Sequence, residues 1–326
     1  MVRRDHRRTA RRSAGRGGRG QRGGRRTGPT LSGRPDWPRV ERAIFRVRQH
    51  YRYTYTGPVW DLHQRLVMIP RDRHRDQQLL EYDLAVRGTE GDHRIAWERD
   101  QFGNRVACVV ANRVPQAVDF EATFRLERTL TSAAAQPAPW RNDAERLEYL
   151  RPTALTAPDK RLIDAALEIA HASADARERA ERAQAWTATS ITYQFGVTGY
   201  STPAAMALHL GRGVCQDYAH ILLTLLRLLN VPARYVSGHL IGEGAPHAWI
   251  EAFIERGPGE VEVLGYDPTH ARPVRIDYLT VAVGRDFADV SPTSGSYGGP
   301  ALGRLAASKQ AEIVELGYAG SGEAVA

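Results

Sequence analysis

The stretch "GRGVCQDYAHILLTLLRLLN", residues 211–230, joins a glycine-containing turn to a strongly apolar run. Apolar residues recur at helical spacing after Cys215, so the pattern predicts a buried helix over about 215–230 that begins at Cys215. Unpaired N–H groups and the helix dipole make a helix start electropositive, which favours a thiolate and can stabilise an oxyanion. A nucleophile is useful at this position and a core filler is not, so we interpret Cys215 as a nucleophile.

A cysteine nucleophile requires a base, and the base requires a group that orients it. His247 begins the strand-like run "HAWIEAFIE", residues 247–255, and Asp267 lies in the next such run, "VEVLGYDPT", residues 261–269. If the two runs pair as neighbouring strands, Asp267 can reach the far ring nitrogen of His247 and fix its tautomer. The order Cys, His, Asp on a helix and two strands therefore predicts a catalytic triad.

The blocks "GVCQDYAHILLTLLRLLNVPARYVSGHL", "HAWIEAF" and "GYDPT" together resemble the bacterial transglutaminase-like superfamily. The likeness extends over about residues 40–300, because "VAVGRDFADVSPTSGSY" is similar to the segment after the triad and "MIPRD" and "DQFGN" to the preceding domain. It implies an α+β fold, in which a papain/transglutaminase-like core follows an antiparallel β domain. In that core a helix bearing Cys packs on an antiparallel sheet bearing His and Asp.

Residue by residue, the resemblance implies Cys215 as nucleophile, His247 as base and Asp267 as the group that orients the base. Two positions depart from the family pattern. "VEVLGY" lacks the Trp that usually precedes Asp-Pro-Thr, and His270 stands where Asn often follows the Thr. We expect both departures to alter the floor of the cleft and neither to change the triad.

The resemblance also implies acyl transfer on a peptide or isopeptide amide through a thioester on Cys215. Hydrolysis by a cysteine peptidase or amidase is favoured over transamidation, because water needs no second binding site. The alternative is a nucleic-acid-associated or scaffold protein whose transglutaminase-like domain is catalytically silent. We expect a peptide or protein substrate and no cofactor, and the sequence does not indicate the oligomeric state.

Three residues near the predicted triad are candidates for substrate binding. Gly213 suits a tight turn that lets a substrate backbone approach. Asp217 can cap the helix start or bind a substrate amine, and capping is the favoured interpretation. Trp249 lies two residues beyond His247, on the same strand face, where it shields the imidazole or packs in the core.

A zinc site is the rival interpretation of the same region. His220 and His239 could join Cys215 and His247 as ligands. Cys-x4-His is an uncommon zinc spacing and no second cysteine is near, so we expect no metal site. His220 is better explained as a histidine of the core.

The chain organisation follows from composition and periodicity. Period-two runs, such as Leu80, Tyr82, Leu84 and Val86, predict an antiparallel β domain over 37–130, with Cys108 as a small core residue. The full prediction divides the chain into a disordered tail 1–36, this β domain, a linker 131–157, a catalytic domain 158–290 with helices near 158–172, 174–190 and 202–209, and a C-terminal segment 291–326 that is partly a closing strand near 311–317 and partly disordered.

The positive charge of the chain is concentrated in its tail. Net charge is +8, but residues 1–35 hold 12 arginines and one aspartate, so the remainder carries −3. Nucleic acid is therefore expected to bind only through the tail, and a solvated extension is favoured over an RNA-binding arm. Two cysteines, no apolar leader and no apolar run of membrane length predict a cytoplasmic protein that does not bind membranes.

Overall fold

The computed structural model describes residues 35–130 and 136–319. After a short 3-10 helix, η1 (Trp37–Arg39), the first part of the chain forms two antiparallel sheets. One sheet has the order β17-β1-β7-β4-β3, with β17 (Gly303–Tyr318), β1 (Val40–Tyr55), β7 (Ala117–Thr129), β4 (Gln77–Arg87) and β3 (Arg73–His74). The other has the order β16-β2-β6-β5, with β16 (Thr293–Gly298), β2 (Val59–Leu66), β6 (Arg105–Val114) and β5 (Glu90–Arg99).

Side chains from both sheets form one apolar cluster, as in a β sandwich. Tyr51 and Phe120 from the first sheet join Leu62 and Val109 from the second in this buried cluster. The alternation of apolar and polar residues explains the arrangement, because successive strand side chains point to opposite faces.

Two expectations for these strands need correction. Leu80 and Tyr82 are each 41% exposed rather than buried, because most of β4 forms the open edge of its sheet. Cys108 is only partly buried, since Ala107 and Val109 occupy the face of β6 that lines the sandwich. Cys108 lies on the other face and packs against the core of the helical part of the chain.

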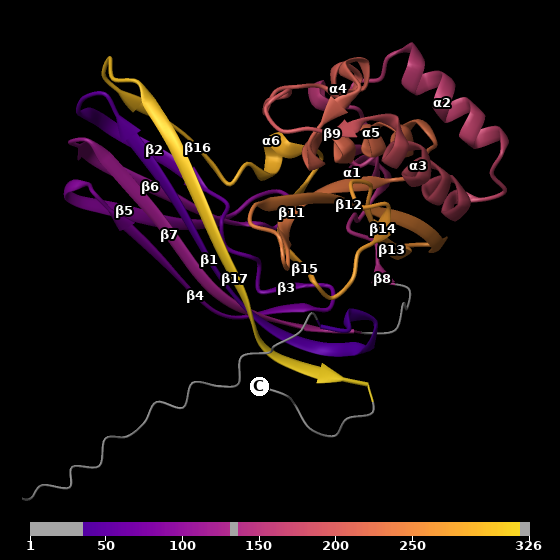
Figure 1. Ribbon diagram of the computed structural model, residues 1–326, viewed down its shortest axis with the longest axis horizontal. Helices are drawn as coiled ribbons and strands as arrows, with labels where there is room; N and C mark the ends of the chain where they lie inside the picture. The colour runs from indigo at the N-terminus through magenta and orange to yellow at the C-terminus, as the bar shows by residue number, and fades with distance from the viewer. Residues whose placement is uncertain (1–34, 131–135, 320–326) are drawn as a thin grey trace, which may run out of the picture. The chain divides into compact units, whose positions relative to one another are not determined.

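The second half of the chain builds an antiparallel sheet of order β14-β13-β12-β11-β15, and helices pack against it (Figure 1). Its strands are β11 (Ala233–Leu240), β12 (Pro246–Gly257), β13 (Glu260–Asp267), β14 (Arg272–Pro273) and β15 (Tyr278–Gly284). The helices are α2 (Lys160–His171), α3 (Ala176–Ser190), α4 (Ala204–Leu210), α5 (Cys215–Leu228) and α6 (Phe287–Val290). Helix α5 contacts β11 and β12 on one side and α2, α3 and α4 on the other, so it is buried nearly all round.

The C-terminal segment is a larger part of the β region than the sequence predicted. One closing strand was expected near 311–317, whereas β16 pairs with β2 and β17 pairs with β1 along nearly its whole length (Figure 1). The sandwich therefore contains strands from both ends of the chain. The predicted disordered end after residue 319 lies outside the described residues.

The segment predicted as a linker contains regular structure. Strand β8 (Gln136–Pro137) pairs with β13, and α1 (Asp143–Glu148) and the 3-10 helix η2 (Ala154–Thr156) follow. No helix within the described ranges is long and apolar enough to cross a membrane.

Side-chain amides connect the sandwich to the edge strand β15. The Gln77 amide accepts from the backbone N–H of Thr280 (2.9 Å) and donates to its carbonyl (2.7 Å). Asn104 makes the same pair of hydrogen bonds with Val283, at 2.9 and 2.7 Å. An edge strand has unpaired backbone groups that must be satisfied when buried, and these two side chains satisfy them.

Candidate active site

Helix α5 begins at Cys215, as the sequence predicts, and a short strand places it. Helix α4 ends at Gly211, whose φ of 63° terminates the helix in the left-handed conformation. Strand β10 (Arg212–Gly213) then pairs in parallel with β9 (Thr192–Tyr193). The loop before Cys215 is thereby fixed on both sides.

The carboxylate of Asp217 holds the start of α5. Its Oδ2 accepts the backbone N–H of Val214 and the hydroxyl of Thr198, each at 2.7 Å. Asp217 has no exposed surface and burial raises its pKa. These contacts favour the capping interpretation of Asp217, and its contact with substrate stays a prediction.

Gly213 is required by the same cap. A Cβ on this residue would lie 2.6 Å from Oδ2 of Asp217, so any larger residue would displace the carboxylate. The role of Gly213 in substrate approach stays a prediction, because it is buried beneath the loop it shapes.

Strands β12 and β13 pair as neighbours and bring His247 and Asp267 together. His247 Nε2 lies 2.8 Å from Oδ2 of Asp267, and both side chains are almost fully buried. This hydrogen bond leaves Nδ1 of His247 for proton transfer with Cys215. Trp249 stacks on the imidazole with ring centroids 6.2 Å apart and is itself buried, so it both shields and packs.

Asp267 is the centre of a hydrogen-bond network larger than a triad. Its Oδ2 also accepts from the hydroxyl of Tyr278 and lies near Nδ1 of His270, each at 2.7 Å. Its Oδ1 accepts the backbone N–H of Thr269 at 2.9 Å. Although burial favours the neutral acid, the bonds from His247 and His270 hold the pKa of Asp267 far below its usual value.

The same contacts keep the two histidines positively charged near neutral pH. Burial alone would lower the pKa of His247, but its interactions with Asp267 and Cys215 outweigh burial and raise the pKa to about 10. Hydrogen bonds with Asp267 and Glu243 raise the pKa of His270 to about 9. A charged His247 is the partner that stabilises a thiolate at Cys215.

Glu243 is the member of this site that sequence reasoning missed entirely. It lies in the loop between β11 and β12, with Oε2 3.5 Å from Nδ1 of His247 and Oε1 3.0 Å from Nε2 of His270. Lys309 of β17 donates to the carbonyl of Ala245 in the same loop, at 2.9 Å. The C-terminal strand therefore reaches the loop that places Glu243.

The two other unpredicted contacts had different signals in the sequence. His270 was visible as a departure from the family pattern, although its bond to Asp267 was not. Tyr278 had no signal, because it reaches Asp267 from a strand that begins 11 residues later.

The zinc ligands weighed from sequence do not come together. His220 is fully buried in α5, and its Nε2 accepts the backbone N–H of Phe287 at 3.2 Å. His239 is also buried and stacks on Phe124. Among the described residues, the group of three or more side chains that could hold a metal ion is Glu243, His247 and His270.

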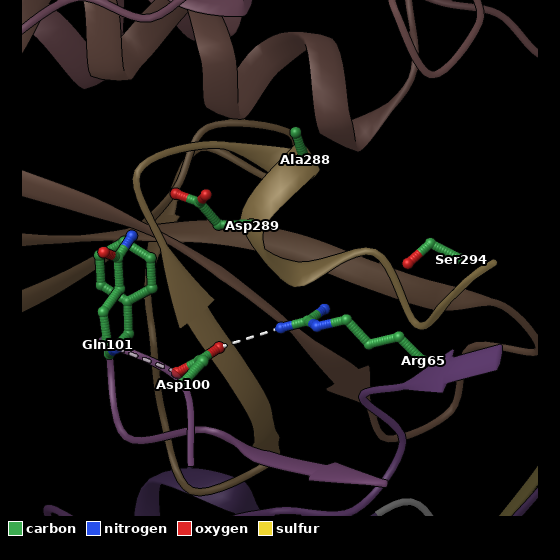
Figure 2. Close-up of a pocket in the computed structure, with 7 residues that line it drawn as sticks. Arg65, Asp100, Gln101, Ala288, Asp289 and Ser294 are labelled. Atoms are coloured by element: carbon green, nitrogen blue, oxygen red, sulfur yellow. Dashed lines mark hydrogen bonds and ion pairs between the residues drawn. The ribbon is translucent and has the colours of Figure 1, made fainter. Parts of the chain in front are cut away.

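A hollow of about 380 Å³ lies away from the triad (Figure 2). The turn at Asp100–Phe102, Arg65 and the start of α6 line it, and Arg65 pairs with Asp100 at 3.3 Å. It contains none of Cys215, His247 and Asp267. The chemistry is therefore concentrated at the start of α5, where Tyr193, Phe195 and Tyr200 of the preceding loop are 48%, 74% and 72% exposed.

A buried α-helix with Cys at its first residue, packed on a sheet that supplies His and Asp, defines the transglutaminase-like class of papain-like folds. Residues 163–260 match the Transglutaminase-like superfamily, and residues 45–127 match the Bacterial transglutaminase-like N-terminal region. Together these segments span more than half of the chain. The chain belongs to the transglutaminase-like superfamily and carries the N-terminal region found in its bacterial members.

Relatives by sequence are mycobacterial. The chain is 38% identical over 162 residues to "Uncharacterized protein ML0607" of Mycobacterium leprae, covering 47% of this chain and 56% of that protein. It is 40% identical over 118 residues to "Uncharacterized protein Rv2569c" of Mycobacterium tuberculosis, covering 33% and 38% of the two chains. The chain therefore spans about half or less of these relatives.

A solved structure shares the fold. The crystal structure of a "Putative Cysteine Protease" from Cytophaga hutchinsonii superposes with a TM-score of 0.68 at 19% identity, covering 85% of this chain and 93% of that one. The likeness spans both the β region and the helical core, which confirms the predicted α+β fold and the order of its two parts.

Proposed function

We propose that the protein is a cysteine hydrolase that cleaves a peptide or isopeptide amide through a thioester on Cys215. The observation that carries the proposal is the bond of 2.8 Å between His247 and Asp267 beside the first residue of α5. A charged imidazole and a helix N-terminus acting on one thiol are the conditions that produce a reactive thiolate.

In the acylation step the Cys215 thiolate attacks the substrate carbonyl and forms a C–S bond. The carbonyl oxygen becomes an oxyanion, and the backbone N–H groups of the first turn of α5 stabilise it. His247 then gives its Nδ1 proton to the departing amine, the C–N bond breaks, and a thioester remains on Cys215.

In the deacylation step His247 is neutral and acts as a base. Nδ1 takes a proton from water while the water oxygen attacks the thioester carbonyl. The C–S bond then breaks, the carboxylic acid leaves, and thiolate and imidazolium are restored. Throughout both steps Asp267 holds Nε2 of His247, so that Nδ1 stays directed at the reacting groups.

Hydrolysis is favoured over transfer to an amine, because water requires no second binding site. The exposed aromatic side chains of Tyr193, Phe195 and Tyr200 support a peptide or protein substrate, since they offer apolar surface in the loop that leads to Cys215. A binding role for the Arg-rich tail remains a prediction, because residues 1–34 lie outside the described part of the chain.

The proposal is tested by trapping the acyl-enzyme. The full chain is treated with a library of amide-like electrophiles, and adducts are located by mass spectrometry, with Cys215→Ala and Cys108→Ser as matched variants. We expect adducts on Cys215 that persist in Cys108→Ser. Adducts spread equally over both cysteines would instead support the catalytically silent scaffold. Product analysis with and without added primary amine then distinguishes hydrolysis from transamidation.

A further inference from the structure

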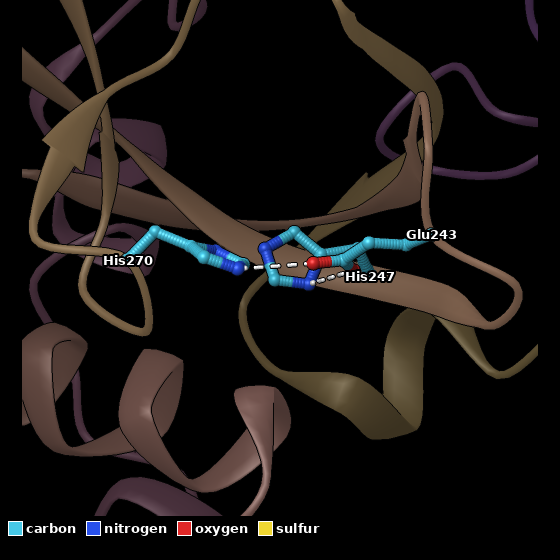
Figure 3. Close-up of side chains that lie close together, drawn as sticks. All are labelled: Glu243, His247 and His270. Atoms are coloured by element: carbon cyan, nitrogen blue, oxygen red, sulfur yellow. Dashed lines mark ion pairs between the residues drawn. The ribbon is translucent and has the colours of Figure 1, made fainter.

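Glu243, His247 and His270 place three ligand atoms around one point beside the nucleophile (Figure 3). These atoms are a Glu243 carboxylate oxygen, Nδ1 of His247 and Nε2 of His270, and they lie within 4.8 Å of one another. The carboxylate is 3.5 Å from the first nitrogen and 3.0 Å from the second. Ligand atoms around a tetrahedral zinc ion, with bonds near 2.0–2.1 Å, lie roughly 3.3 Å apart. The spacing is therefore close to that of a metal site.

Asp267 orients both imidazoles toward that point. Its Oδ2 lies 2.8 Å from Nε2 of His247 and 2.7 Å from Nδ1 of His270. Each ring thus directs its far nitrogen to the same carboxylate, and the remaining nitrogen of each ring faces Glu243. A carboxylate behind a histidine ligand fixes the tautomer and raises ligand basicity in metal sites, and here one carboxylate serves two ligands.

We propose that Glu243, His247 and His270 form an inhibitory site for a zinc-class transition-metal ion. Imidazole nitrogens select zinc and related transition metals, whereas calcium requires six to eight oxygen ligands, which this group does not provide. The site is open to solvent, since the side chains of Glu243 and His270 are 34% and 36% exposed. A metal ion can therefore reach it from solution.

The metal would stop catalysis through His247. Its Nδ1 lone pair is the one that the proposed mechanism uses for proton transfer, so coordination removes the general base reversibly. Cys215 interacts with the same imidazole, which makes its thiolate a candidate fourth ligand. Inhibition rests on the proposed function, whereas metal binding itself depends only on the three side chains.

The first experiment measures binding of Zn²⁺ to the full chain by isothermal titration calorimetry. We expect one ion per chain and an affinity at least about tenfold weaker in His270→Asn and in Glu243→Gln, because even changes behind a ligand cost about 10–100-fold. His209→Asn, which removes an exposed histidine of α4, is the matched control and should leave the affinity unchanged. If His270→Asn does not fold by circular dichroism, Glu243→Gln in the exposed loop decides the result.

The second experiment measures whether Zn²⁺ slows alkylation of Cys215 by iodoacetamide. We expect the metal to slow the wild type at least about tenfold at saturation, and to have little effect on Glu243→Gln relative to its own metal-free rate. Absence of binding by the wild type, or equal affinity in both ligand variants and the control, overturns the site. Binding without slower alkylation overturns its inhibitory role. Binding with no acylation of Cys215 by any electrophile overturns the proposed function and leaves the metal site standing.

Discussion

Strand β12 carries two buried carboxylate–histidine pairs, and the pairs have opposite charge states. His247 lies 2.8 Å from Asp267, and Glu251 lies 2.9 Å from His74 of β3. The pKa of His247 is raised to about 10, whereas burial lowers the pKa of His74 to about 4. Equal distance and similar burial therefore do not decide whether a histidine is charged.

The cations around each carboxylate explain the difference. Arg234 contacts Glu251 at 2.7 Å and Arg75 lies 3.6 Å from it, so the negative charge is already balanced and a second buried cation is disfavoured. Asp267 instead receives bonds from two histidines and Tyr278, so its charge is available to His247. One pair consequently joins β3 to β12, and the other supplies an imidazolium to Cys215.

The largest effect is expected from removing the charged histidine. His247→Ala should lower the rate of Cys215 acylation by an activated ester by about 10²–10⁴-fold, because general acid–base catalysis contributes that much. Asp267→Asn should cost less, since the orienting carboxylate is worth about four orders of magnitude in serine-protease triads and a cysteine enzyme starting from an ion pair depends on it less. Stopped-flow or quenched acylation measures both rates. The opposite ranking, with both variants folded by circular dichroism, would contradict these roles.

The structural pair should respond in stability rather than in reactivity. Glu251→Gln leaves His74 and Arg234 without their buried anion, and breaking such a pair costs about 3–5 kcal/mol. Glu255→Gln, four residues along the same strand, removes an exposed partner of Arg146 and should cost about 0–1 kcal/mol. Urea denaturation compares the two variants. Equal destabilisation would show that the buried pair has no special weight in the fold.

The two cysteines should differ more moderately. Iodoacetamide should alkylate Cys215 at least about tenfold faster than Cys108 near neutral pH, because reactivity follows the thiolate. Burial and the hydrogen bond to Glu98 raise the pKa of Cys108. Peptide mapping after timed alkylation gives both rates. Equal rates in the folded protein would remove the basis for Cys215 as nucleophile.

The smallest effect is expected from deleting residues 1–35. This segment carries most of the positive charge but none of the residues of either pair on β12. Acylation of Cys215 should therefore change by less than a factor of two, an order-of-magnitude expectation for surface changes away from the site. An activity assay paired with RNA binding tests this. Loss of RNA affinity together with unchanged acylation would assign the tail a separate role, and loss of acylation would contradict the separation.

Local pattern in the sequence predicted the elements that carry the triad. The helix beginning at Cys215 and the strands bearing His247 and Asp267 are confirmed, because their apolar periodicity reflects burial on a single face or on all sides. The assignment of their chemical roles stays a prediction that the geometry supports.

Contacts between distant segments could not be predicted in the same way. Strand β17 pairs with β1 across more than 240 residues, and its exposed, mostly polar face gives little apolar signal. Glu243 lies in a glycine-rich loop, where composition indicates a turn and says nothing about which side chain the turn directs inward. Such placements depend on the folded arrangement of several elements at once.

The pH dependence of stability follows from the two histidines with opposite signs. His247 has a raised pKa, so its contribution to stability is complete below its ordinary value of about 6.5 and is lost as pH rises through about 10. His74 has a lowered pKa, so the unfolded chain gains its proton first, and stability falls as pH decreases from about 6.5 toward 4. Both losses should be visible in denaturation measured across this range.

The most direct test is an NMR titration of the ring resonances of His247 and His74, assigned with His247→Ala and His74→Asn. We predict that His247 remains an imidazolium until the pH approaches about 10, and that His74 remains neutral until about 4. A Cys215→Ala variant should lower the transition of His247, because one of its stabilising partners is removed. Titration of both histidines near the ordinary value of about 6.5 would contradict the claim that Cys215 has a charged partner.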